Sequence, residues 1–240
     1  MDLTRITKPA RKVLKLKKCG AVIVAAGSAS RMGGIDKVMA SLGGEPMIAR
    51  TVRAFQECDA VSEIIIVTRE DLILPITNLT GNCGKVKAVV AGGKSRQESV
   101  GKGLNALSKD VKLAAIHDGA RPLITWQLID WVIRAANTYG AAAPAVPVKD
   151  TVKTVEGGIV VNTPDRSKLR AVQTPQVFDI DMLKGALLKA YQDGAEVTDD
   201  CSAVERLGMK VKIVEGDEKN LKVTTPMDLK IAEMLLEEEK

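Results

Sequence analysis

Aromatic residues are scarce in this chain, and their scarcity limits both its core and its partners. Of its 240 residues, two are Phe, two are Tyr and two are Trp, although 45% are hydrophobic. The core must therefore consist mainly of Val, Ile, Leu and Ala, the usual filling between a buried parallel sheet and its helices. With so few rings available for base stacking, we expect no nucleic-acid partner, despite a formal charge of +5.

Long apolar runs are absent as well. No run of about 18 apolar residues occurs, and the basic stretch "RITKPARKVLKLKK" at residues 5–18 lacks the apolar segment of a signal peptide. Much of the positive excess lies in this stretch. We therefore expect a cytoplasmic protein with no membrane partner, a flexible basic extension at residues 1–19 and a single domain at residues 20–240.

Closely spaced cysteines are missing too. The four cysteines are far apart and form no C-x-x-C pair: Cys19, Cys58, Cys83 and Cys201. This spacing favours buried thiols in a reducing compartment over disulfides or a zinc site.

What the chain does have is an alternation of strand-like and helical patterns. Helical spacing of apolar residues follows Pro46 and again follows Ser95. Short apolar runs bounded by Gly or charged residues predict strands at 21–26, 63–68, 86–91 and 113–118. Because strands and helices alternate, the sequence predicts an α/β fold with a mostly parallel sheet flanked by helices. Ligands are then expected at the carboxyl ends of the strands.

The alternation is interrupted at residues 151–178. Two alternating segments surround "EGG" at 156–158, which predicts a β-hairpin in an inserted arm, and Pro164 and Pro175 exclude a long helix. The α/β pattern then resumes with expected helices near 180–191 and 200–207, a strand at 211–216 and a last helix from about 226.

The run "AAGSASRMGGIDK" at residues 25–37 follows the first expected strand. It lacks the Gly-Lys-Ser/Thr of a Walker A loop and the glycine spacing of a dinucleotide fingerprint. Exposed amides of small residues, with Arg31 and Lys37 adding positive charge, would suit a triphosphate. Taken alone, the run could equally be an ordinary loop between a strand and a helix.

Eight motifs follow one another along the chain. They are "AAGxxxRM" (25–32), Lys37, "GGKSRQESV" (92–100), "IHDGARP" (116–122), "PVKDTVK" (147–153), "TPQ" (174–176), "TDD" (198–200) and "NLKVTTPMDL" (220–229). With these motifs in this order, the chain over about residues 20–232 resembles the 2-C-methyl-D-erythritol 4-phosphate cytidylyltransferases of the non-mevalonate isoprenoid pathway. The resemblance implies a Rossmann-like nucleotidyltransferase fold and a homodimer with shared active sites, in which the hairpin arm reaches the neighbouring subunit.

The resemblance also implies roles for individual residues. Arg31, Lys37 and Lys222 would act on the triphosphate and the transition state, and Asp118 would bind Mg²⁺ or another divalent cation. CTP would be bound by Ala25, Ala26, Gly27, Ser28, Ala29, Gly92, Gly93, Ser99 and Gly119. A polyol phosphate would be bound by Arg121, Thr151, Arg166, Thr174 and Thr198.

The chemistry of cytidylyl transfer agrees with these roles. A substrate phosphate must attack the α-phosphorus in line while pyrophosphate leaves, so cations are needed on several sides. The single histidine, His117, is not expected to be a base, because a phosphate monoester with a pKa of about 6 is already ionised. Since strand residues alternate in direction, His117 should point away from the ligand-facing side that Asp118 occupies.

Alternatives and departures stay open at this point. A ribitol 5-phosphate cytidylyltransferase shares most of these motifs, and a nonenzymatic nucleotide-binding protein of this fold is a further alternative. Four positions depart from patterns common in the family. Lys94 replaces an acidic residue found in some relatives, Ala29 replaces a frequent Gly, and Asp36 and Val38 flank Lys37 where Pro and Gln are common.

Overall fold

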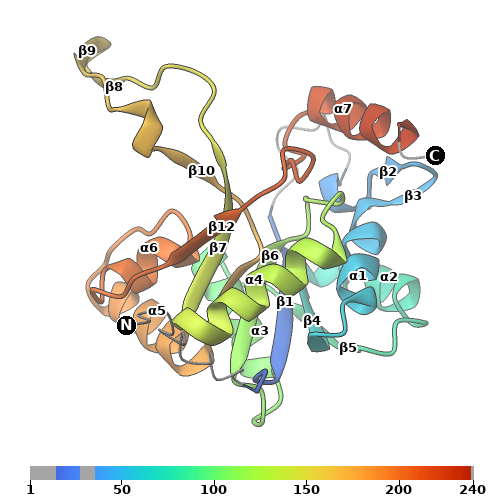
Figure 1. Cartoon of the computed structure of the whole chain (residues 1–240). Helices are drawn as coiled ribbons and strands as arrows, with labels where there is room; N and C mark the ends of the chain where they lie inside the picture. The colour runs from blue at the N-terminus through green and yellow to red at the C-terminus, as the bar shows by residue number, and fades with distance from the viewer. Residues whose placement is uncertain (1–14, 28–35, 239–240) are drawn as a thin grey trace, which may run out of the picture.

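The computed structural model describes residues 15–27 and 36–238, which form an α/β body and a projecting arm (Figure 1). The body is centred on an eight-stranded sheet in the order β10, β7, β11, β6, β1, β4, β5, with β12 paired to β7. These strands are β1 Cys19–Ala25, β4 Val61–Thr68, β5 Val86–Ala91, β6 Leu113–Asp118, β7 Ala141–Pro147, β10 Arg170–Val172, β11 Gln176–Asp179 and β12 Lys212–Glu215.

The predicted mostly parallel sheet is confirmed. β5, β4, β1 and β6 pair in parallel, in agreement with the four strands expected from the sequence. β10 and β11 run antiparallel to their neighbours. The helices are α1 Met47–Glu57, α2 Ile73–Leu79, α3 Arg96–Ala106, α4 Trp126–Tyr139, α5 Ile180–Gln192, α6 Asp200–Glu205 and α7 Pro226–Glu237.

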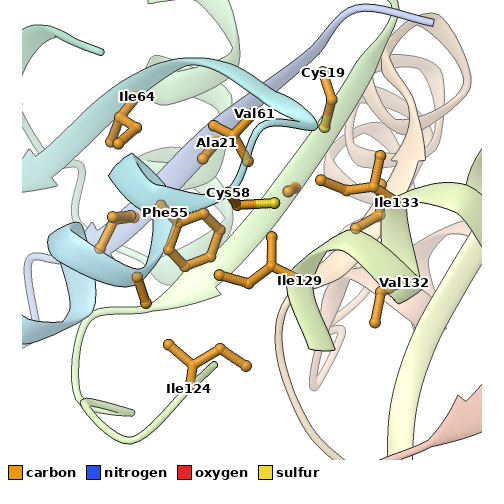
Figure 2. Close-up of a cluster of buried hydrophobic side chains, with 14 of the residues drawn as sticks. Cys19, Ala21, Phe55, Cys58, Val61, Ile64, Ile124, Ile129, Val132 and Ile133 are labelled. Atoms are coloured by element: carbon orange, nitrogen blue, oxygen red, sulfur yellow. The ribbon is translucent and has the colours of Figure 1, made fainter. Parts of the chain in front are cut away.

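Apolar side chains cover both faces of the sheet, and alternation along β1 divides them. Ala21 and Ile23 belong to one cluster, which includes residues of α1 and α4, as Figure 2 shows around Phe55 and Ile129. Val22 belongs to the other cluster, with residues of α3 and α5. All four cysteines are free thiols, and three of them are buried. The core on both faces of the sheet is thus mainly aliphatic, as the composition predicts.

The N-terminal boundary lies earlier than the domain expected from residue 20. β1 begins at Cys19, and the Lys18 carbonyl accepts the N–H groups of Lys112 and Leu113. The Lys17 N–H donates to Asn137 Oδ1 at 3.0 Å. Residues 15–19 of the expected flexible extension are therefore attached to the body, and residues 1–14 lie outside the described part of the chain.

The expected arm divides into two parts. β8 Thr154–Glu156 and β9 Ile159–Asn162 form the predicted hairpin, which extends away from the body (Figure 1). Gly157 and Gly158 join them with φ of 55° and 82°, conformations that side chains disfavour. Residues 170–172 and 176–178, also expected in the arm, instead lie in β10 and β11 of the main sheet. In the described ranges, no helix has the length and apolarity needed to cross a membrane.

Candidate active site

A cavity of about 420 Å³ opens at the carboxyl ends of β1 and β6, where the fold places ligands. It brings together many of the predicted residues. From this set it is lined by Ala25, Ala26, Gly27, Lys37, Gly93, Ser99, Asp118 and Lys222. Ser28, Ala29 and Arg31, also predicted here, lie outside the described residues.

Asp118 is the charged centre of this cavity. It ends β6, and Lys222 Nζ lies 2.9 Å from its Oδ2. Arg96 Nε lies 3.6 Å from Oδ1, and Arg121 Nε lies 3.7 Å from Oδ2. Burial opposes ionisation of this carboxyl, but the nearby Lys222, Arg96 and Arg121 outweigh it and lower the pKa of Asp118 to about 2. Asp118 is therefore a carboxylate at neutral pH.

As a single carboxylate, Asp118 suits a metal site that is completed by substrate phosphates and water. In the described part of the chain, no group of three or more His, Cys, Asp or Glu side chains is placed to hold a metal ion. Mg²⁺ commonly binds through one or two carboxylates together with substrate phosphates and water. Asp118 fits that pattern, whereas a permanent protein-only metal site would need more ligands.

Lys37 reaches the cavity from the short 3₁₀ helix η1, Lys37–Met39. Asp36 caps this helix by accepting the Val38 N–H at 3.1 Å. Its other carboxylate oxygen lies 2.5 Å from Arg69 Nη1, and Arg69 also pairs with Asp71 at 2.8 Å. Asp36, one of the departures noted in the sequence, therefore ties the segment that carries Lys37 to the end of β4.

The glycine motif after β5 is held together by Ser99. Its hydroxyl accepts the Gly93 N–H at 3.0 Å and donates to the Ser95 carbonyl at 2.9 Å. The predicted cap of α3 is confirmed, because Ser95 Oγ accepts the Glu98 N–H at 3.1 Å. A Cβ on Gly92 would come within 2.4 Å of Ala26 Cβ, so only glycine allows the two loops to approach this closely.

Arg96 is the residue of this site that the sequence analysis missed. It lines the cavity, and its guanidinium contacts Asp118 and, through Nη2 at 2.8 Å, Asp200 Oδ2. Arg96 lies inside the quoted "GGKSRQESV" motif, but no role was assigned to it. The sequence does place a cation directly after the capping Ser95, and this position could have indicated a role for Arg96 at the site.

The comparisons with known proteins identify the family. The family model for 2-C-methyl-D-erythritol 4-phosphate cytidylyltransferase matches residues 19–238. The chain belongs to this family. The cytidylyltransferase of this name from Symbiobacterium thermophilum is 48% identical over 220 residues, covering 91% of this chain and 92% of the relative. The one from Caldanaerobacter subterraneus is 46% identical, covering 90% and 97%.

Solved structures of the cytidylyltransferase family agree with the fold. The 4-diphosphocytidyl-2C-methyl-D-erythritol synthase from Anaerococcus prevotii has a TM-score of 0.84 at 32% identity, covering 92% of this chain and 96% of that chain. The Thermus thermophilus 2-C-methyl-D-erythritol 4-phosphate cytidylyltransferase has a TM-score of 0.75 at 31% identity, covering 92% and 99%. The similarity thus extends over nearly the whole cytidylyltransferase domain.

His117 lies behind this cytidylyltransferase site, as the alternation of β6 predicts. It is fully buried, and burial lowers the pKa of His117 to about 3. Thr174 Oγ1 accepts the Asp118 N–H at 3.1 Å and lies 3.0 Å from His117 Nδ1. We assign the hydroxyl proton to that contact, which leaves Nε2 to donate to the Arg121 carbonyl at 3.4 Å. The expected orientation of His117, away from the ligand-facing side, is confirmed.

The residues predicted to bind the acceptor are not all gathered at this cavity. Thr174 is buried behind Asp118, and Arg121 Nη1 donates to the Asn220 carbonyl at 2.6 Å. Gly119, which was predicted to bind CTP, packs close to Ala25 without lining the cavity. Thr198 is exposed just before α6. Their roles in the cytidylyltransferase reaction stay predictions.

The two arm residues of that set are separate from the cavity within one chain. Thr151 is exposed, and Arg166 Nη1 donates to the Lys149 carbonyl at 2.6 Å. Arg166, Lys149 and Arg170 line an open depression at the base of the arm. A cytidylyltransferase site that used Arg166 would therefore need the arm of another copy or a rearranged arm.

Proposed function

We propose that this chain transfers the cytidylyl group of CTP to 2-C-methyl-D-erythritol 4-phosphate. The products are 4-diphosphocytidyl-2-C-methyl-D-erythritol and pyrophosphate, and the reaction serves non-mevalonate isoprenoid precursor synthesis. The observation that carries the proposal is Asp118 among Lys222, Arg96 and Arg121, in a cavity that Lys37 also lines. Family membership and the relatives named above support the choice of substrates.

The cations of the site have a clear task in this reaction. An acceptor phosphate oxygen forms a bond to the α-phosphorus of CTP, the bond to the β-phosphate oxygen breaks, and pyrophosphate leaves. Positive charge from Lys37 and Lys222 neutralises the attacking and leaving groups and stabilises the transition state. The acceptor phosphate is largely ionised at neutral pH, since its second pKa is about 6. No side chain needs to remove a proton, in agreement with the buried, neutral His117.

Asp118 is the residue that we propose to hold Mg²⁺ together with the phosphates of CTP. When bound, the ion would neutralise phosphate charge and help to orient the α-phosphate. Lys222 and Arg96 now balance the charge of Asp118. The same two cations would also serve as ligands for phosphate oxygens of CTP.

Pyrophosphate release tests the reaction and its substrate. The protein is incubated with Mg²⁺ and CTP plus 2-C-methyl-D-erythritol 4-phosphate, plus ribitol 5-phosphate, or with no acceptor. We expect release with the first acceptor only. If pyrophosphate is released only in the incubation with ribitol 5-phosphate, that compound is the acceptor. If the protein binds CTP but releases no pyrophosphate with either acceptor, it is a nonenzymatic nucleotide-binding protein.

The metal proposal has its own variant. Asp118→Asn keeps the shape of the side chain and removes its charge, so Mg²⁺-dependent release should fall sharply and need more Mg²⁺. Asp130→Asn, which alters a surface carboxylate paired with Arg134 on α4, serves as the control. An unchanged Mg²⁺ titration in Asp118→Asn would place the metal ligand elsewhere.

A homodimer joined through the arm completes the proposal. Val155, Ile159, Val160 and Val161 of the hairpin are all exposed, with Ile159 at 72%. Apolar side chains on a projecting hairpin are suited to burial against another copy of the chain. The exposed Arg166 would then reach the acceptor phosphate of the neighbouring site. We also propose a cytoplasmic location, which the four free thiols support.

A further inference from the structure

Asp200 is a buried carboxylate next to the cavity that the proposed mechanism does not use. It is the first residue of α6, and its side chain is 1% exposed. Its ion-pair partner is Arg96, whose Nη2 lies 2.8 Å from Oδ2. A carboxylate at this depth requires a paired cation, since an unpaired buried charge is strongly unfavourable.

The position of Asp200 is fixed from behind by Gln176 of β11. Gln176 Oε1 accepts the N–H groups of Asp200 and Cys201, each at 3.0 Å. Gln176 Nε2 donates to Asp199 Oδ2 at 2.7 Å, and Asp199 caps α6. The main sheet therefore holds the backbone from which the Asp200 carboxylate extends.

Arg96 contacts two carboxylates, and Asp200 is the nearer of them. Arg96 begins α3, where the partial positive charge of a helix N-terminus disfavours a cation. Lys222 and Arg121 also contact Asp118, so Arg96 shares that carboxylate with two other cations. The contact with Asp118 is long, at 3.6 Å, whereas the contact with Asp200 is short. Asp200 is thus the stronger anchor for Arg96.

We propose that Asp200 is a positioning residue that acts through Arg96. Gln176 holds Asp200, Asp200 holds the Arg96 guanidinium on the cavity wall, and Arg96 in turn holds Asp118 Oδ1 in a fixed orientation. The Asp118 carboxylate would then already have the orientation needed to bind the metal ion that accompanies the nucleotide. This proposal rests on the proposed function, because it assigns Asp118 to that nucleotide site.

The test measures CTP affinity separately from turnover. Calorimetric titration with CTP and Mg²⁺, without acceptor, reports binding alone, and pyrophosphate release with acceptor reports turnover. Asp200→Asn removes a charge-assisted contact, so CTP affinity should fall about tenfold or more. Arg96→Gln should lose at least as much, and the double variant should lose no more than Arg96→Gln alone.

Two further variants keep the result interpretable. Arg96→Lys leaves Asp200 with a cation, so the fold should persist, but an ammonium cannot contact both carboxylates with a planar fork, and CTP affinity should fall part of the way. Asp193→Asn is the matched control, because Asp193 pairs with Arg206 at 3.3 Å on the surface. Its CTP affinity should equal that of wild type.

The outcomes separate this proposal from the proposed function. Wild-type affinity in Arg96→Lys and in folded Asp200→Asn would overturn the positioning role, even with a lower melting temperature. Additive losses in the double variant would overturn it too, since Asp200 would then act independently of Arg96. If wild type binds CTP but releases no pyrophosphate, the proposed function fails, and the binding measurements still decide the role of Asp200.

Discussion

The charge state of each side chain at the site depends on the balance between burial and neighbouring charge. Asp118 and His117 are adjacent on β6, and both are largely excluded from water. Asp118 stays charged because Lys222 and two arginines compensate for its burial. For His117, burial outweighs the opposing effect of the Asp118 charge, and the imidazole is neutral. Strand alternation thus separates a charged ligand-facing side from a neutral side that faces the core.

His117 should make stability depend on pH. Its pKa is about 3 when folded and about 6.5 when unfolded, so only the unfolded chain takes up a proton between these values. The stabilisation is fully present above pH 6.5 and is lost as the pH falls towards 3. For wild type, the free energy of unfolding should drop by about 2 kcal/mol between pH 7 and pH 5 from this group.

Urea unfolding at pH 7, 6 and 5 without added metal measures this drop. The chain has one histidine, so His117→Gln should remove most of the slope. The variant should also keep the pH profile of turnover, because no base is needed. An unchanged slope would contradict the buried neutral imidazole, and a lost limb near pH 6.5 in the turnover profile would restore His117 as a base.

Lys37 should matter through its charge. In Lys37→Ala, the cavity loses a cation that we propose for the triphosphate, and turnover should fall at least about a hundredfold, roughly 3 kcal/mol of transition-state stabilisation. The melting temperature should change little, since Asp36 and Arg69 still hold the segment. Lys230→Ala, an exposed lysine on α7, is the control. Turnover equal to the control would remove Lys37 from the mechanism.

The sequence predicted some of these residues because their signals are local. Lys37, Asp118 and Lys222 are charged residues within motifs, and the orientation of His117 follows from its neighbour. The role of Arg96 depends on Asp200, which is 104 positions further along the chain and is brought near by α6. Nothing in the spacing of these two residues indicates that they meet. A buried ion pair between distant segments needs the fold itself.

Among the elements, α3 depends on a close approach to the sheet. Gly103 faces β1 and β4, and a Cβ there would lie 2.3 Å from Val22 Cγ1 and 2.9 Å from Val67 Cγ2. Both valines are fully buried and cannot move aside freely. α3 carries Arg96 and Ser99, so this approach also sets the position of the cavity wall.

A pair of glycine variants in this one helix tests the packing. Gly103→Ala should destabilise the protein by about 1–3 kcal/mol, because overpacking outweighs the gain in helix propensity. Gly101→Ala, with open space at its Cβ, should stabilise by about 0.5–1 kcal/mol. Chemical denaturation measures both. If the two variants shift stability in the same direction, α3 does not pack as described.

Prediction of elements succeeded where the pattern is local. β1, β4, β5 and β6 are apolar runs with clear boundaries, whereas β11 was assigned to the arm because nothing local shows its antiparallel pairing with β6. α4 received no prediction, although Thr125 caps its start and Gly140 ends it with φ of 85°. β7 has two prolines in seven residues, which hides it from propensity rules.

For the whole molecule, the arm is the feature that one chain alone does not explain. All residues from 151 to 163 are exposed, and none of them lines the cavity. An exposed, largely apolar two-stranded hairpin is marginally stable by itself in water. Packing against a second copy of the chain would bury its apolar side chains, and this is the arrangement that we propose.

Mixed dimers distinguish a shared site from a site within one chain. If each site takes Lys37 from one subunit and Arg166 from the other, Lys37→Ala and Arg166→Ala homodimers should both be nearly inactive. After mixed refolding, a heterodimer would contain one site with both defects and one with neither. Random assortment makes about half of the dimers mixed, so activity should recover to about a quarter of wild type.

The same mixing gives a different result if the arm serves its own chain. Every site would then carry one defect, and mixing would restore nothing. Subunit exchange must be shown independently, for example by mass spectrometry of differently tagged variants. Lys168→Ala mixed with Lys37→Ala is the matched control, since Lys168 is an exposed arm cation that pairs with Asp165. Each Lys168→Ala dimer should be active without mixing, so recovery specific to the Arg166→Ala mixture would tie that guanidinium to the neighbouring site.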